Sequence, residues 1–160
     1  MKTFSDERDM YPRISDFLAE RGFSTKTAFN SKFFGYEIDV VGRNEKDDIV
    51  CAEAKLGSFG KAFRQVLKRK EFSNFSYVAI PIEIINNWSL SLYYLKHSHL
   101  EHGNPKFTTH AIQGKIQACR EAGVGLLAVG RNSVVEIIVP RKQEVKNFQK
   151  QKIIEEFELN

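Results

Sequence analysis

Two extended segments, 33–43 and 49–56, are joined only by the short charged turn 44–48, and this connection restricts the fold more than any other feature of the sequence. A connection of this length lets two neighbouring strands pair only in the antiparallel sense. Side chains of a strand alternate between its two faces, so the first segment should present two different surfaces. The alternation predicts one face made of Phe34, Tyr36, Ile38 and Val40, opposite Gly35, Glu37, Asp39 and Val41.

Charged residues interrupt these otherwise apolar segments. Alternation places Glu37 and Asp39 on one face of the first strand, and Glu53 and Lys55 on one face of the second. A half-buried carboxylate is costly unless it is paired, hydrogen-bonded or bound to a metal. Carboxylates on neighbouring strands, about 5 Å apart, can share one Mg²⁺ ion, and an adjacent lysine can orient a bound water or neutralise a phosphate.

Periodicity in the rest of the chain predicts an α/β fold that borders on α+β, with a central mixed sheet flanked by helices. One domain, 1–160, is expected, with a core at about 5–81, an insertion at 84–106 and a C-terminal helix within 143–160. A crossover helix after a meander of strands makes the sheet mixed. The expected helices are 5–21, 58–72, 109–122 and 143–159, and the expected strands are 23–30, 33–43, 49–56, 77–81, 124–129 and 134–139.

Composition restricts the class of protein. A hydrophobic fraction of 42% over 160 residues is sufficient for a substantial core in one soluble domain. The polar start of the chain and its two cysteines, Cys51 and Cys119, argue against secretion and a disulfide scaffold, so a cytoplasmic protein is expected. The net charge of +4 permits a polyanionic partner without requiring one.

Asp39, followed by Glu53-Ala54-Lys55, resembles the signature of the PD-(D/E)XK nuclease superfamily, which includes restriction endonucleases, Holliday-junction resolvases and repair nucleases. The order of helix, three strands, helix and strand over 5–81 is similar to the αβββαβ core of that superfamily. The resemblance covers about the first half of the chain. Ile38 stands where the superfamily name has proline.

The resemblance implies a set of catalytic roles. Asp39 and Glu53 would bind Mg²⁺ or Mn²⁺, and Lys55 would assist the attacking water. Many members add a glutamate from the first helix, and Glu7 is preferred here to Glu20 because it opens the helix ahead of the strand meander.

The helix that follows the second strand supplies further candidates. Gln65 resembles a glutamine that one nuclease branch uses to hold the site or to contact DNA. A basic stripe on the same helix is expected to follow nucleic-acid phosphates. A homodimer would suit a small nuclease that cuts both strands of a duplex. The members of the basic stripe are Lys61, Arg64, Lys68 and Arg69.

Three functions are compatible with these features. The first is a metal-dependent nuclease that hydrolyses DNA, in repair, recombination or restriction. The second is a catalytically silent nucleic-acid-binding module on the same fold. The third is a protein-interaction or regulatory subunit that docks through 84–102. A structural alternative to the metal site is that Glu37, Glu53 and Lys55 form a solvated face of ordinary ion pairs on an antiparallel sheet.

Overall fold

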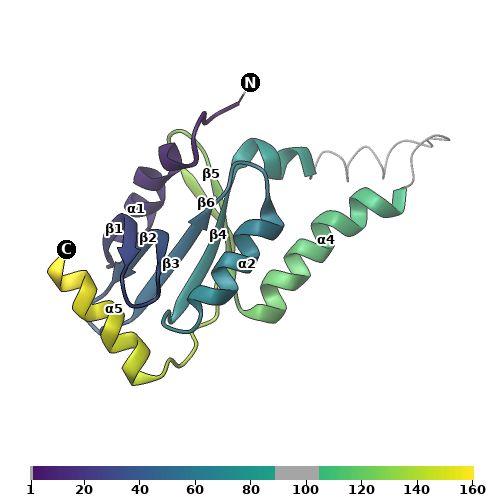
Figure 1. Ribbon diagram of the computed structural model, residues 1–160. Helices are drawn as coiled ribbons and strands as arrows, with labels where there is room; N and C mark the ends of the chain where they lie inside the picture. The colour runs from purple at the N-terminus through teal and green to yellow at the C-terminus, as the bar shows by residue number, and fades with distance from the viewer. Residues whose placement is uncertain (1, 89–104) are drawn as a thin grey trace.

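One mixed sheet organises the part of the chain that the structure describes (Figure 1). The structure is a computed structural model that describes residues 2–88 and 105–160, with side chains for 2–88 and 113–160. The order in the sheet follows the sequence, with β3 parallel to β4, β4 parallel to β5, and the other neighbours antiparallel. The strands are β1 (Ser24–Ser31), β2 (Tyr36–Arg43), β3 (Ile49–Ala54), β4 (Phe75–Pro81), β5 (Gly125–Val129) and β6 (Val134–Ile138).

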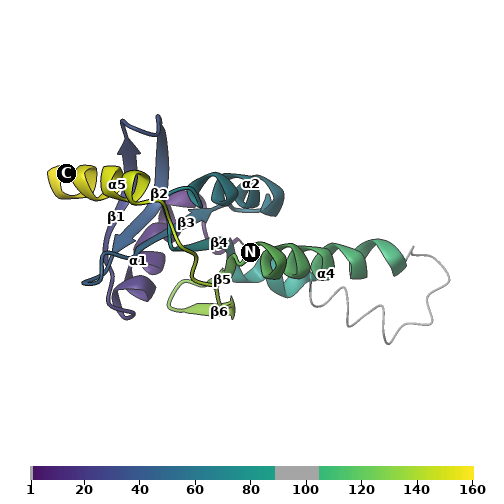
Figure 2. The same cartoon turned by 90° about the horizontal axis from the view of Figure 1, so that it is seen from below.

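Helices cover both faces of the sheet. Helix α1 packs on one face, whereas α2 and α5 lie on the other (Figure 2). The expected α/β fold with its central mixed sheet and antiparallel β2–β3 pair is therefore confirmed. The helices are the short 3-10 helix η1 (Glu7–Met10), α1 (Tyr11–Ala19), α2 (Phe59–Arg69), α4 (Pro105–Ala122) and α5 (Asn147–Leu159).

Local sequence explains where the helices that support the site begin. Pro12 lies in the first turn of α1, where a missing N–H leaves no hydrogen bond unmade. The Ser58 side chain accepts from the backbone N–H of Lys61 and caps α2. α5 is docked, because its buried residues Ile153 and Phe157 join the core on the face that α2 also covers.

The expected alternation along β2 is wrong at Asp39. Ile38 and Val41 contribute to the same core cluster, whereas Val40 contributes to the cluster on the α1 side. The β1–β2 ladder skips the pair of Ala28 and Asp39, and Ala28 has a φ of 47°. A positive φ is unfavourable for a residue with a Cβ, so the interruption is a specific local distortion of the two strands.

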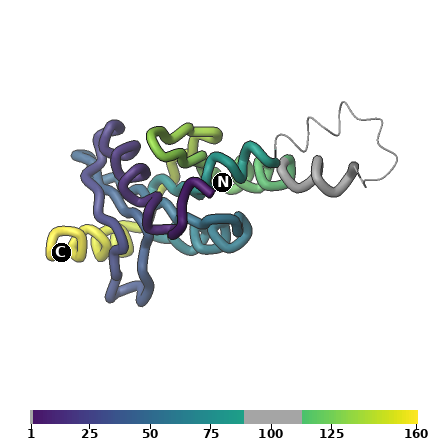
Figure 3. Tube along the Cα trace, turned by 90° about the horizontal axis from the view of Figure 1, so that it is seen from above, coloured from purple at the N-terminus to yellow at the C-terminus, as the bar shows by residue number. Residues whose placement is uncertain are grey.

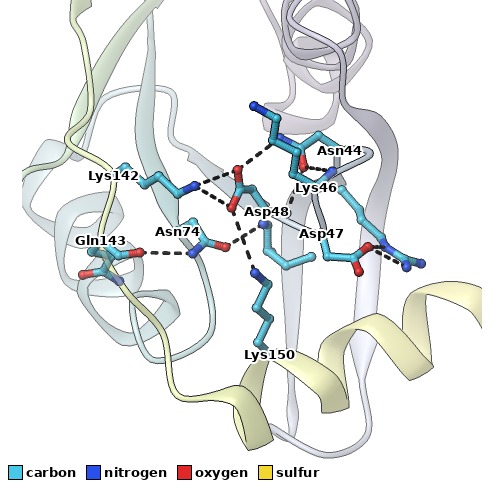
Figure 4. A network of polar contacts seen from close by, with 10 residues as sticks. Asn44, Lys46, Asp47, Asp48, Asn74, Lys142, Gln143 and Lys150 are labelled. Atoms are coloured by element: carbon cyan, nitrogen blue, oxygen red, sulfur yellow. Dashed lines mark hydrogen bonds and ion pairs between the residues drawn. The ribbon is translucent and has the colours of Figure 1, made fainter.

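The segment between β6 and α5 is hydrogen-bonded to the end of the sheet at which the β2–β3 turn lies (Figure 4). Asp48, just before β3, accepts from the Lys142 ammonium at 3.0 Å and from the Asn44 amide at 3.3 Å. The Gln143 backbone N–H donates to the Asn74 carbonyl at 3.0 Å. These bonds hold the chain that leads into α5 against the β2–β3 turn.

We expect Asp48→Asn to lower the free energy of unfolding at neutral pH by about 1 kcal/mol, because a charge-assisted bond is lost. Burial would raise the pKa of Asp48, but the bonds from Lys142 and Asn44 outweigh burial and hold that pKa below its usual value. The stabilisation is therefore present above the unfolded-state pKa and disappears as the pH falls through the folded-state pKa. Denaturation at neutral and acidic pH measures the effect, and exposed Asp47→Asn is the matched control. Equal losses for both variants would contradict the prediction.

Within residues 2–88 and 105–160, no helix combines the length and the apolar composition needed to cross a membrane. The predicted insertion at 84–106 and the docking segment 84–102 lie largely outside the described residues, which resume at Pro105 with α4.

Candidate active site

Strands β2 and β3 separate beside the candidate site. Their ladder ends at the pair Val40 and Ala52, and the same register carried one residue further sets Asp39 opposite Glu53. The N–H of Ala54 donates to Asp39 Oδ2 at 2.8 Å instead of to a carbonyl of β2. A carboxylate side chain therefore takes the place of a strand carbonyl at this position.

Two neutral donors hold the Asp39 carboxylate. The Tyr11 hydroxyl, at the start of α1, donates to Asp39 Oδ1 at 2.7 Å, and the Ala54 N–H occupies the other oxygen. Asp39 is only 7% exposed, and no ion pair to it occurs within residues 2–88 and 113–160. Burial raises the pKa of Tyr11, and the hydrogen bond to Asp39 raises it further, so the hydroxyl stays protonated and remains a donor.

Glu53 is the most deeply buried acid of the site, at 1% exposure. Burial raises the pKa of Glu53 to about 8, and the charge of Asp39 and a side-chain hydrogen bond between the two carboxyls add to the rise. Arg69 acts in the opposite direction, because its Nε donates to Glu53 Oε1 at 2.6 Å. The raised pKa means that the Glu53 carboxyl gains from a compensating positive charge, which a bound cation could provide.

Arg69 closes the opening between the strands from the α2 side. It is only 3% exposed, and its Nη2 donates to the Glu37 carbonyl at 3.0 Å while its Nε contacts Glu53. Its guanidinium lies 3.8 Å from the centre of the Tyr36 ring. The assignment of Arg69 to an exposed phosphate-contacting stripe is therefore wrong: the side chain is an internal counter-ion of Glu53.

Lys55 leaves the end of β3 beside Glu53. Its ammonium donates to Glu7 Oε2 at 2.7 Å, and its backbone N–H is anchored to the Ala79 carbonyl at 3.1 Å. Glu7 therefore orients the lysine. Among the described residues, no group of three His, Cys, Asp or Glu side chains could hold a metal ion, so the geometry does not place Glu7 with Asp39 and Glu53 as a third metal ligand.

Of the remaining α2 residues predicted to act in the site, one has a buried polar atom and the others are exposed to solvent. Gln65 is one helical turn before Arg69, and its Oε1 is buried without a hydrogen-bond partner in the described part of the chain. An unpartnered buried oxygen of this kind is rare and calls for a ligand or water. By contrast, Lys61, Arg64 and Lys68 are exposed, as the basic stripe requires.

Two members of the site were missed from the sequence. Tyr11 carries no signal, because nothing in a helix start indicates which distant carboxylate a hydroxyl will reach. Arg69 could have been found: it follows Gln65 by four residues, and positions i and i+4 lie on one face of a helix. Because Gln65 was assigned to the site, the shared helix face would have predicted that the Arg69 side chain also faces β3 rather than solvent.

A cleft of about 790 Å³ lies at the opposite end of β3, beside the β2–β3 turn. Its lining includes the aromatic residues Phe23, Phe75 and Tyr77 and the charged residues Glu45 and Lys46. None of the residues at the Asp39–Glu53 contact lines it, so this cleft and the candidate site are separate features of the molecule.

Comparison with known proteins bears on the fold alone. No model of a known protein family matches the chain, and no curated protein matches it. The solved structure of the SPO1766 protein of unknown function from Silicibacter pomeroyi is similar, with a TM-score of 0.63 and 16% sequence identity. The similarity covers 98% of this chain and 86% of that chain. At this level of identity, the similarity shows that the two chains share a fold.

Proposed function

We propose that this protein is a metal-dependent nuclease that hydrolyses DNA phosphodiester bonds, with Asp39 and Glu53 as the metal ligands. The observation that carries the proposal is that these two carboxyls are buried next to each other: burial, and after it the charge of Asp39, raises the pKa of Glu53 to about 8. Buried acids brought together need a compensating positive charge, which Arg69 supplies to Glu53 from one side and which an enzyme can also obtain by binding a metal.

The donor set suits Mg²⁺ or Mn²⁺. Mg²⁺ prefers oxygen ligands, is commonly held by one or two carboxylates and keeps several of its waters. Asp39 and Glu53 supply two such groups, and the buried Gln65 Oε1 offers another unpartnered oxygen on α2. When bound, such an ion lowers the pKa of a coordinated water and polarises a phosphate.

The chain itself would position the reacting groups. The Tyr11 hydroxyl and the Ala54 N–H fix both oxygens of Asp39, so this ligand needs no reorganisation. Lys55, held by Glu7, would place its ammonium where negative charge grows on the phosphate or where water must be oriented. Outside this centre, the exposed stripe of Lys61, Arg64 and Lys68 would contact the phosphate backbone.

A catalytically silent nucleic-acid-binding module is the second candidate, and Arg69 favours it. The guanidinium already supplies Glu53 with a positive charge in a pair whose side chains are only 4% and 1% exposed. If this pairing is permanent, a metal has no access to the Glu53 carboxylate. The protein would then bind nucleic acid in a salt-dependent manner but would not hydrolyse it.

Cleavage assays separate the two candidates. The purified protein is incubated with plasmid, single-stranded, branched and RNA substrates, in Mg²⁺, in Mn²⁺ and in chelator. The nuclease proposal expects products that need the metal and disappear in Glu53→Gln. Salt-sensitive binding without turnover in either metal would favour the silent module.

Metal binding itself should release about one proton per ion near neutral pH, because the pKa of Glu53 is raised to about 8 and this carboxyl must lose its proton to bind the ion. Titration of Mn²⁺ by calorimetry in two buffers of different ionisation enthalpy measures this number. Affinity should rise with pH up to about 8, the raised pKa of Glu53. Glu53→Gln is the matched variant, expected to bind weakly and to release no proton. Proton-free binding by the native protein would refute the assignment of the ligands.

A further inference from the structure

A row of aromatic rings leads from the candidate site to the surface. It begins at Tyr36, beneath Arg69, and continues through Phe34 to Phe33, with centroid distances of 6.0 and 4.9 Å. Phe148 of α5 follows at 5.7 Å from Phe33. The outer two rings are exposed, Phe33 by 47% and Phe148 by 63%. Phe33 belongs to the turn of the β1–β2 hairpin, which projects past α5 on the side of the sheet that α2 also covers (Figure 3).

Positive charge accompanies the exposed rings. The Lys152 ammonium lies 5.9 Å from the centre of Phe33 and 5.5 Å from that of Phe148. Lys32, next to Phe33, and Lys146, near Phe148, are both exposed. Lys32 makes no ion pair within residues 2–88 and 113–160.

The neighbouring acids offset this charge only in part. Both oxygens of Glu156 are occupied, by the Ser31 hydroxyl at 2.6 Å and the Phe33 N–H at 2.8 Å. Glu155 lies 3.5 Å from Lys152. Among these residues three lysines stand against two glutamates, so the surface is apolar at its centre and keeps a small excess of positive charge at its edge, which is complementary to a polyanion that carries flat apolar groups.

We propose that Phe33 and Phe148 form a base-stacking surface for single-stranded nucleic acid, with Lys32, Lys146 and Lys152 contacting its phosphates. Unpaired bases have free faces that stack on aromatic side chains without regard to sequence, whereas the bases of a duplex are already stacked on each other. The inference rests on the proposed nuclease function in one respect: Tyr36, the inner end of the ring row, stacks with Arg69, and Arg69 contacts Glu53 of the candidate site.

The test is a binding measurement that does not depend on cleavage. Fluorescence anisotropy of a labelled oligothymidylate is followed in chelator, over a range of salt concentrations, with a duplex of the same length for comparison. We expect preferential binding of the single strand, about tenfold weaker in Phe33→Ala or in Phe148→Ala. Phe148→Leu, which keeps apolar area but removes the ring, should lose nearly as much. Lys152→Gln should reduce the slope of log affinity against log salt concentration by about the amount that one phosphate contact contributes.

Leu159→Ala, at an exposed apolar residue on the same helix, is the matched control and should bind normally. Because both phenylalanines are exposed, their variants should fold, which thermal unfolding checks. Unchanged affinity in both alanine variants would overturn the inference. It would also be overturned if the protein bound anionic vesicles instead of the oligonucleotide, or if it bound no oligonucleotide but self-associated in a manner that Phe33→Ala abolishes. Stacking-dependent binding with no cleavage in any metal would uphold the surface and reject the nuclease. Metal-dependent cleavage at the native rate in all of these variants would uphold the nuclease and reject the stacking surface.

Discussion

Asp39→Asn is expected to reduce metal-dependent DNA cleavage by about 10³-fold or more, because the lost metal ligand removes several kcal/mol of transition-state stabilisation. Asparagine keeps the shape of the side chain and one oxygen, so one of the bonds from Tyr11 and Ala54 can still form. The other position would then face an NH₂ group instead of an acceptor. Initial rates with Mn²⁺ and with Mg²⁺ measure the change, together with the melting temperature.

The matched control is Asp48→Asn, which alters another buried carboxylate at the opposite end of β3. It should lose stability but keep its cleavage rate at a temperature where it remains folded. If Asp39→Asn cleaves as fast as the native protein, the activity does not come from this carboxylate pair. If both variants lose activity equally, the effect is one of stability and the catalytic assignment fails.

Arg69→Met is expected to lower the free energy of unfolding by about 3 kcal/mol, since removing one partner of a buried ion pair leaves the other unpaired. Methionine retains much of the apolar stem, so the loss reports mainly on the guanidinium. That group bonds to Glu53 and to the Glu37 carbonyl and stacks on Tyr36. Chemical denaturation of both proteins measures the difference.

The loss should depend on pH in a defined direction. The folded-state pKa of Glu53, about 8, lies above its usual value of 4.5, so its contribution to stability is fully present below the usual value and is lost as the pH rises through about 8. Arg69 lowers that pKa, and its removal lets the pKa rise further. Arg69→Met should therefore lose more stability at alkaline than at mildly acidic pH.

A double variant isolates the ion pair. Arg69→Met combined with Glu53→Gln removes both charges, and much of the lost stability should return. A loss that is the same at acidic and alkaline pH, or that the second substitution does not relieve, would show that packing of the arginine matters more than its charge. In the single variant, tighter Mn²⁺ binding would indicate that Arg69 and the metal compete for Glu53.

Particular residues show how far the sequence could be interpreted. The short charged turn predicted the antiparallel pairing of β2 and β3, and that register brings Asp39 and Glu53 into contact. Alternation along β2 was wrong, because the distortion at Ala28 and Asp39 has no local signature in side-chain type. Arg69 was assigned to solvent, since a positive charge on an amphipathic helix is usually exposed.

From the sequence alone, the order of the elements and the antiparallel pairing of the two strands that carry Asp39 and Glu53 could be predicted. These features follow from short-range rules of turn length and strand periodicity. The groups that surround the two acids follow from tertiary packing: a hydroxyl from α1, a guanidinium from α2 and a lysine held by Glu7. Such contacts depend on how helices distant in sequence pack on the sheet, and burial in that packing sets the pKa of Glu53.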